Sequence, residues 1–175
     1  NTITTHPITP NTYSINAVSL SGSYTVGAAG VYTTLTAAIA AYNSACLTGP
    51  VVFNLIDLSY SASETFPITI NANPFSSSVN TFTIKTTLAG TAITGSSASG
   101  LIVLNGADWV TIDGSISSTV NTICPPSAAS RDLTITNTNV STASAVIWLQ
   151  NTAAPALDGA THITIMNCNV AGSLN

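Results

Sequence analysis

Four side chains that could do chemistry occur in three similar segments of this sequence: Asp108, Arg131, Asp132 and His162. The segments read ADWVTIDG from residue 107, SRDLTITN from residue 130 and ATHITIMN from residue 160, and they align without gaps. If they stack in this register, Asp108 lies above Arg131, and Asp132 lies beside His162. The alignment therefore predicts a small polar column with a salt bridge and a hydrogen-bonded pair.

Two kinds of polysaccharide chemistry would suit this column. A glycoside hydrolase needs two carboxyl groups about 5 to 9.5 Å apart, which Asp108 and Asp132 would supply. A lyase needs a base, here Arg131, beside carboxylates that hold Ca²⁺. The sequence has a single Arg and lacks the paired-Asp and Gly-His-Gly motifs of such hydrolases. We therefore expect a structural role, no metal, no cofactor and no enzyme activity, with the lyase or hydrolase as the alternative.

The composition is that of an all-β protein with very little charge. Charged residues make up 5% of the chain, against roughly 25% in an ordinary soluble domain. Thr, Ser and Asn take their place, and the β-branched Thr, Val and Ile favour pleated, half-buried strands. The apolar share of 45% and a mean hydropathy of +0.44 predict a folded chain. Its 175 residues suit one domain.

The same composition excludes two classes of partner. Lys85 and Arg131 are the only Lys and Arg residues, so nothing would attract a phosphate backbone, and we expect no nucleic-acid binding. Apolar residues alternate with Thr, Asn and Ser, so no run reaches the roughly 18 residues of a membrane span. The chain begins at Asn1 without a basic and apolar leader, as expected of a mature secreted protein or of an excised part of a longer one.

The first 50 residues should hold an extended arm and the only helix. Residues 1–20 contain two prolines among Thr and Asn, which favours an extended arm ahead of a single domain over 21–175. Apolar residues at helical spacing behind Thr33 or Thr34 predict a helix over about 34–45. Gly49 and Pro50 are expected to end it.

Short, β-branched segments fill the rest of the chain and predict eight strands: 51–57, 66–70, 81–86, 101–106, 109–114, 132–137, 145–151 and 162–167. Asn and Gly at the strand ends, as at Asn105 and Asn137, favour tight corners and stacked Asn ladders. The alignment predicts two apolar core columns. One contains Val110, Leu133 and Ile163, and the other contains Ile112, Ile135 and Ile165.

Similar strands at intervals of roughly 20 to 30 residues, without helices between them, are typical of a β-solenoid. We therefore predict a right-handed parallel β-helix with rungs over about 51–170, capped at its N-terminal end by the helix. The other end has no evident cap. Of the three cysteines, we expect Cys124 and Cys168 to pair, leaving one free thiol.

Several longer stretches resemble a known family: GSYTVG, YTTLTAAIAAYNS, TGPVVFNL, ETFPITIN, NTFTIKT, ITGSSASGLIVLNGADWVTIDGS and RDLTITNTN. In this order, over about residues 21–170, they resemble the β-helical modules of Bacteroidetes cell-surface, adhesin-like proteins, whose fold is pectin-lyase-like. The resemblance implies export, in many members by the type IX route, and an extracellular or cell-surface location. Members are mostly uncharacterised, so it implies no particular activity.

An open strand edge templates further pairing, so we expect the chain to bind copies of itself. Head-to-tail stacking through the open C-terminal rung, with the arm at 1–20 across the joint, would give a surface filament. The expected function is therefore that of an extracellular structural or adhesive protein. The alternative is a module of a large adhesin that binds glycans on a host or neighbouring cell, where Trp109 and Trp148 would stack on sugar rings.

Overall fold

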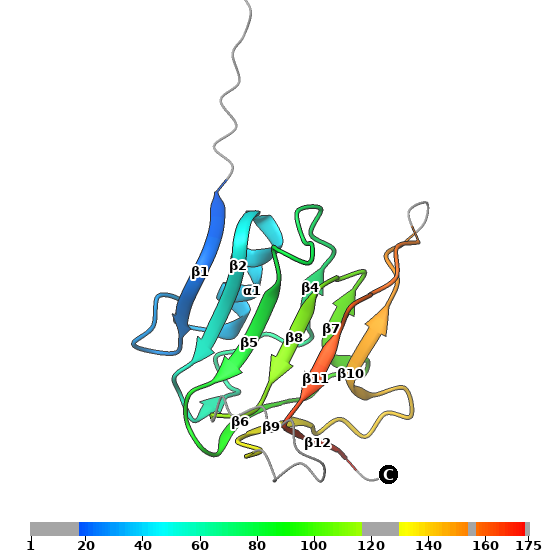
Figure 1. Ribbon diagram of the computed structural model, residues 1–175. Coiled ribbons are helices and arrows are strands. Elements are labelled where there is room, and N and C mark those ends of the chain that lie inside the picture. The colour runs from blue at the N-terminus through cyan, green and yellow to red at the C-terminus, as the bar shows by residue number, and fades with distance from the viewer. Residues whose placement is uncertain (1–17, 117–129, 154–156, 174–175) are drawn as a thin grey trace, which may run out of the picture.

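The computed structural model describes residues 18–116, 130–153 and 157–173 (Figure 1). This part of the chain is mostly β-structure with one helix, as the composition predicted. Its elements in chain order are β1 (Ser19–Val26), α1 (Leu35–Ser44), β2 (Cys46–Leu55), β3 (Ser59–Tyr60), β4 (Ile68–Asn71), β5 (Phe82–Thr86), β6 (Thr91–Gly95), β7 (Gly100–Asn105), β8 (Val110–Asp113), β9 (Leu133–Asn137), β10 (Ala145–Gln150), β11 (Thr164–Met166) and β12 (Cys168–Gly172).

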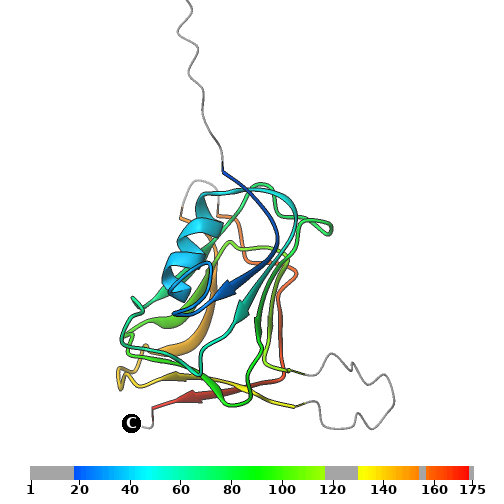
Figure 2. The same cartoon turned by 90° about the vertical axis from the view of Figure 1, so that its left-hand side faces the viewer.

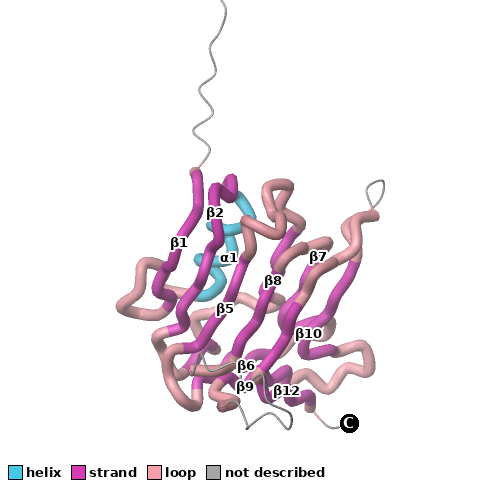
Figure 3. The backbone as a smooth tube through the Cα atoms, viewed as in Figure 1, coloured by secondary structure: helices cyan, strands magenta, loops and turns pink. Residues whose placement is uncertain are grey.

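The strands form three sheets, and neighbouring strands in each sheet run parallel. Sheet A has the order β1-β2-β5-β8-β11, sheet B has β3-β6-β9-β12 and sheet C has β4-β7-β10. From β2 onward the chain enters the sheets in the repeating order A, B, C, and we call each such round of strands a layer. Figure 3 shows the strands of sheet A side by side, and Figure 2 shows the strands around a common interior.

All eight predicted strands are confirmed, and four further strands were not predicted. The unpredicted strands are β1, β3, β6 and β12. β1 is rich in Ser and Gly, β3 has two residues, and β6 and β12 each contain Ala and Gly and a single β-branched aliphatic residue. Their backbones pair with strands of the neighbouring layers. Their own residue types give little indication of a strand.

The helix prediction is confirmed, with Thr34 as its N-cap: the Thr34 hydroxyl accepts a hydrogen bond from the Ala37 N–H at 3.0 Å. The expected terminator was wrong. The helix ends at Ser44 and Ala45 is already extended, so Gly49 and Pro50 lie inside β2. The boundary of the arm also shifts, because β1 begins at Ser19; residues 1–17 lie outside the described part of the chain.

The two predicted core columns are each split between two sheets. Ile165 of β11 pairs with Ile112 of β8 in sheet A, as expected. Leu133 and Ile135 instead lie on β9 in sheet B, where Ile135 pairs with Ile93 of β6. The alignment was wrong here because the Thr-Ile pattern recurs at each inward-facing strand, whichever sheet that strand joins. The column residues at β8 and β11 differ in burial: Val110 is buried, Ile163 is half-buried and Ile165 is exposed.

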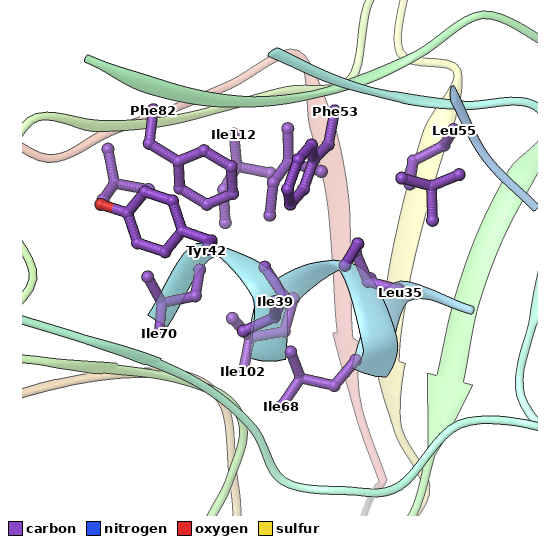
Figure 4. Close-up of a cluster of buried hydrophobic side chains, with 14 of the residues drawn as sticks. Leu35, Ile39, Tyr42, Phe53, Leu55, Ile68, Ile70, Phe82, Ile102 and Ile112 are labelled. Atoms are coloured by element: carbon purple, nitrogen blue, oxygen red, sulfur yellow. The ribbon is translucent and has the colours of Figure 1, made fainter. Parts of the chain in front are cut away.

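The core lies between the sheets and the apolar side of α1. Leu35, Ile39 and Tyr42 of the helix are buried, and the close-up shows them beside side chains of β2, β4 and β5 (Figure 4). The ring of Tyr42 stacks on Phe82 with centroids 4.0 Å apart, and Phe82 meets Phe53 edge to face at 5.0 Å. The three rings together bury a large apolar area, and they meet in orientations that aromatic pairs prefer. The helix therefore closes the apolar interior at the N-terminal end of the sheets.

Replacing Tyr42 by phenylalanine should stabilise the protein by about 1 kcal/mol, because the buried Tyr42 hydroxyl has no hydrogen-bond partner in the described part of the chain. Burial raises the pKa of Tyr42 to about 12, helped by the nearby negative charge of Asp108. The folded state thus favours the neutral phenol. As the pH rises from about 10 through 12, the phenol ionises more readily in the unfolded chain than in the folded protein, and the free energy of unfolding falls. Urea unfolding of both proteins at pH 7 and pH 11 measures the two effects. A loss of more than 1 kcal/mol at pH 7 would contradict the assignment.

Candidate assembly interface at the C-terminal edge

Asp108 does not meet Arg131. Its carboxylate accepts hydrogen bonds from the backbone N–H of Thr161, at 2.8 Å, and from the Thr161 hydroxyl. Asp108 and Thr161 form a parallel bridge just before β8 and β11, so Thr161 occupies the position that the alignment also gave to Arg131. The carboxylate therefore joins two neighbouring layers at one corner, and the expected salt bridge is replaced by bonds to threonine.

Asp132 and Arg131 lie at the other end of β8. The Asp132 N–H donates to the Gly114 carbonyl at 2.7 Å, and the Asp132 carboxylate accepts from the Ile116 N–H at 3.1 Å. Gly114 follows the last residue of β8, whereas Asp108 precedes the first, so the strand length of roughly 13 Å separates the two groups. The structure thus divides the four predicted residues between two corners and does not bring the two carboxylates to one groove.

His162 belongs to the corner with Asp108 and stacks on Trp109. The two rings are 3.8 Å apart and nearly parallel, at 10°. Both residues have left-handed backbone, with φ of 58° at Trp109 and 54° at His162, so the corner has the same shape in successive layers. Because His162 covers one face of the indole, that face of Trp109 is not open to a sugar. Trp148, on β10, is 40% exposed.

The cysteine prediction falls partly outside the described residues, since Cys124 is not among them. Cys168 carries a free thiol, and burial raises its pKa to about 11. Across 18–116, 130–153 and 157–173, no three His, Cys, Asp or Glu side chains gather in a way that would hold a metal ion. No helix in these ranges combines the length and the apolar character needed to cross a membrane.

The last strand of each sheet carries inward-facing apolar side chains that no part of the described chain covers. In sheet C, Leu149 is 48% exposed, whereas its partner Leu104 one layer earlier is fully buried. The same step occurs in sheet A, from Ile112 at 0% to Ile165 at 38%, and in sheet B, from Ile135 at 0% to Val170 at 53%. We call the strands β10, β11 and β12 the C-terminal edge. One more layer of strands would bury all three side chains.

At the opposite end, α1 covers the first edge of sheet C. The side-chain amide of Asn43 imitates a strand next to β4: it donates to the Thr69 carbonyl at 2.8 Å and accepts from the Asn71 N–H at 3.0 Å. The Glu64 carboxylate accepts from the N–H groups of Leu35 and Thr36 at the helix N-terminus, at 2.8 and 2.7 Å. These contacts satisfy backbone groups at the first edge of sheet C and at the N-terminus of the helix, and the two ends of the molecule therefore differ.

A ladder of side-chain amides runs along the ends of the sheet C strands towards the C-terminal edge. The Asn105 amide donates to the Asn71 side-chain oxygen at 3.0 Å, and the Gln150 amide donates to the Asn105 side-chain oxygen at 3.2 Å. Each amide thus donates backward and accepts from the following layer. Within the described ranges, the Oε1 atom of Gln150 has no donor. Stacked Asn residues were predicted at strand ends, but Asn71 and Gln150 were not recognised as members of one ladder.

The three uncovered columns and the unfinished ladder make the C-terminal edge the best candidate for a functional surface in this part of the chain. It can accept backbone hydrogen bonds, bury aliphatic side chains and bind one amide. An open C-terminal rung was predicted from the sequence, but of its three exposed side chains only Ile165 belonged to a predicted column. Comparison with known proteins gives no further guide: no family model, no curated protein and no solved structure matches this chain.

Proposed function

We propose that this protein is a right-handed parallel β-helix that assembles with copies of itself through its C-terminal edge. The repeating A, B, C order of its parallel strands supports the solenoid, because each layer then follows the previous one along a single axis. The right hand is the one that parallel crossovers adopt in nearly all proteins. The exposure of Leu149, Ile165 and Val170, each directly after a buried residue of its column, is the observation that carries the assembly.

The energy of such a contact is moderate for each copy and accumulates in a polymer. Fully burying a Leu, Ile or Val side chain contributes about 1.5 to 3 kcal/mol, and these three are roughly half exposed, so their burial supplies about 2 to 4 kcal/mol. The strand edges add backbone hydrogen bonds, which cost free energy when left unpaired away from water. The low net charge of −4 keeps electrostatic repulsion between copies small.

We place this assembly outside the cell, as a structural or adhesive component of a bacterial surface. The support is the composition, in which Thr, Ser and Asn replace charged residues, together with the resemblance to surface modules described above. A contact that joins one end of a copy to a different surface of the next is heterologous, and it forms an open filament when its rotation does not close. Immunogold electron microscopy of intact source cells tests the location.

The assembly predicts that Val170→Asp weakens self-association at least about tenfold, because a carboxylate buried without a partner costs more than 1.4 kcal/mol. Val79→Asp is the matched control: Val79 is also exposed but lies on the loop between β4 and β5, away from the C-terminal edge. Sedimentation velocity over a concentration series, with negative-stain microscopy, measures the effect. A wild-type chain that stays monomeric, or equal effects of both substitutions, would refute the proposal.

A further inference from the structure

We propose that residues 13–16 of a second copy bind the free edge of β10 as an additional strand of sheet C. The inference rests on the assembly proposed above and names the segment that makes the contact. On its other side, β10 pairs with β7, and no strand in the described ranges lies beyond it. β11 and β12 extend sheets A and B by one more layer, so sheet C is one strand shorter than this layer requires.

The sequence of residues 13–16 matches the strands of sheet C. These strands end in an apolar residue, any residue, an apolar residue and an amide: ITIN at 68–71, IVLN at 102–105 and IWLQ at 147–150. Residues 13–16 read YSIN and have the same pattern. In the register of the sheet, Ile15 would cover Leu149, and Asn16 would lie beside Gln150. The segment thus supplies an apolar group where Leu149 is exposed.

Asn16 also completes the amide ladder. Because Asn105 donates to Asn71 and Gln150 donates to Asn105, the next member must donate to the Oε1 atom of Gln150. The side-chain amide of Asn16 is such a donor, and an amide at this position continues the ladder in the same direction. An aliphatic or acidic residue at position 16 would leave the Gln150 oxygen without a donor.

The order of segments along the chain fits the same arrangement. Each sheet C strand is followed by a sheet A strand: β4 by β5, β7 by β8 and β10 by β11. Residues 13–16 are likewise followed by β1, the first strand of sheet A. In the assembly, β1 of the second copy would then lie beside β11 of the first. β1 pairs with β2 on one side, and among described residues only its last residue, Val26, is bridged on the other, by Tyr32.

The distance excludes binding within one chain. A strand added to β10 would lie in the same layer as β11. β1 and β11 are separated by four strand spacings in sheet A, or about 19 Å. From Asn16 to Ser19 the backbone spans at most about 11 Å, even when fully extended. Residues 13–16 therefore cannot reach the edge of β10 in their own molecule. Strand addition between copies has a general precedent in β-augmentation, in which the backbone supplies affinity and side-chain pockets supply specificity.

The test uses two full-length variants, Asn16→Cys and Gln150→Cys, mixed under oxidising conditions. Neighbouring residues on paired strands are close enough for a disulfide, so we expect a bond between positions 16 and 150 of different chains, identified by mass spectrometry. Asn11→Cys mixed with Gln150→Cys is the control, because residue 11 lies about 16 Å out of register. We expect at least about tenfold more of the 16–150 product than of the 11–150 product.

A second measurement compares Ile15→Asp with Ile8→Asp by sedimentation velocity. Ile15→Asp should weaken association at least about tenfold, since it places a carboxylate against Leu149, and Ile8→Asp should leave it unchanged. If the wild-type chain assembles and Val170→Asp disrupts it, but no 16–150 bond forms and Ile15→Asp has no effect, the strand assignment is wrong while the assembly stands. If the wild-type chain does not assemble at all, the proposed function itself is wrong.

Discussion

Replacing Asn137 by alanine is expected to destabilise the protein by about 4 kcal/mol, because this buried side chain joins three segments of backbone. Its amide donates to the carbonyls of Ser97 and Ala145, at 2.9 and 2.8 Å, and its oxygen accepts from the N–H groups of Ser97 and Asn139, at 3.0 and 3.2 Å. Each buried backbone group left without a partner costs about 1 to 3 kcal/mol, and water can relieve only part of this loss. Asn137 itself is 1% exposed.

Urea unfolding measures this effect, and Asn169→Ala is the matched control. Asn169 is exposed and makes one longer bond, from its amide to the Arg131 carbonyl at 3.3 Å, so its loss should cost less than about 0.5 kcal/mol. The comparison separates the role of Asn137 at the corner from a general effect of removing an amide. A cost below about 1.5 kcal/mol for Asn137→Ala would show that the corner does not depend on this side chain.

The sequence identified eight of the described strands but not the sheets that they join, and Asn137 illustrates why. Residues 133–135 have the same aliphatic-Thr-Ile pattern as residues 110–112 of β8 and residues 163–165 at β11, because every strand of this fold faces the same apolar interior. Local alternation shows which side chains point inward and says nothing about which sheet a strand joins. That choice is made by the corners, where residues such as Asn137 bind backbone from both flanking segments.

The spacing of the repeats along the sequence did not reveal the layers, because the layers contain different numbers of residues. Asn71 and Asn105 are 34 residues apart, Asn105 and Gln150 are 45 apart, and Asp113 and Asn167, which also bond across one layer, are 54 apart. Loops of different length absorb these differences at the surface, where insertions cost little. Aligning segments by similarity alone therefore stacked β9 on β8, although β9 belongs to sheet B and the direct neighbour of β8 in sheet A is β11.

The predicted polar column does not form, because β9 joins sheet B and not sheet A. With β9 in sheet B, Asp132 moves to the corner that follows β8, while Asp108 and His162 stay at the corner that precedes β8 and β11. The exposed side chains of the C-terminal edge were harder to anticipate from the sequence. They could be named only after the register was known, because exposure depends on what lies in the neighbouring layer.

Phe82→Ala should be the most damaging single change in the core, with a loss of about 3 to 5 kcal/mol in the free energy of unfolding. Phe82 is fully buried, and its ring contacts Tyr42 of the helix and Phe53 of β2. Its removal leaves a cavity between the helix and sheet A, and the rigid strands on both sides limit collapse into that space. Phe75→Ala is the control: Phe75 is 46% exposed on a loop, and its truncation should cost less than about 1 kcal/mol.

The consequence for assembly distinguishes the two ends of the molecule. Phe82 lies near the helix-covered end, whereas the C-terminal edge is formed by β10, β11 and β12. A layered protein is stabilised mainly by contacts between neighbouring layers, so damage at Phe82 should lower stability without changing the edge that binds a second copy. Below its unfolding transition, Phe82→Ala should therefore self-associate as the wild type does, while Val170→Asp should unfold like the wild type and fail to associate. Urea unfolding and sedimentation velocity on both variants measure the two properties, and a variant that changes both equally would contradict this separation.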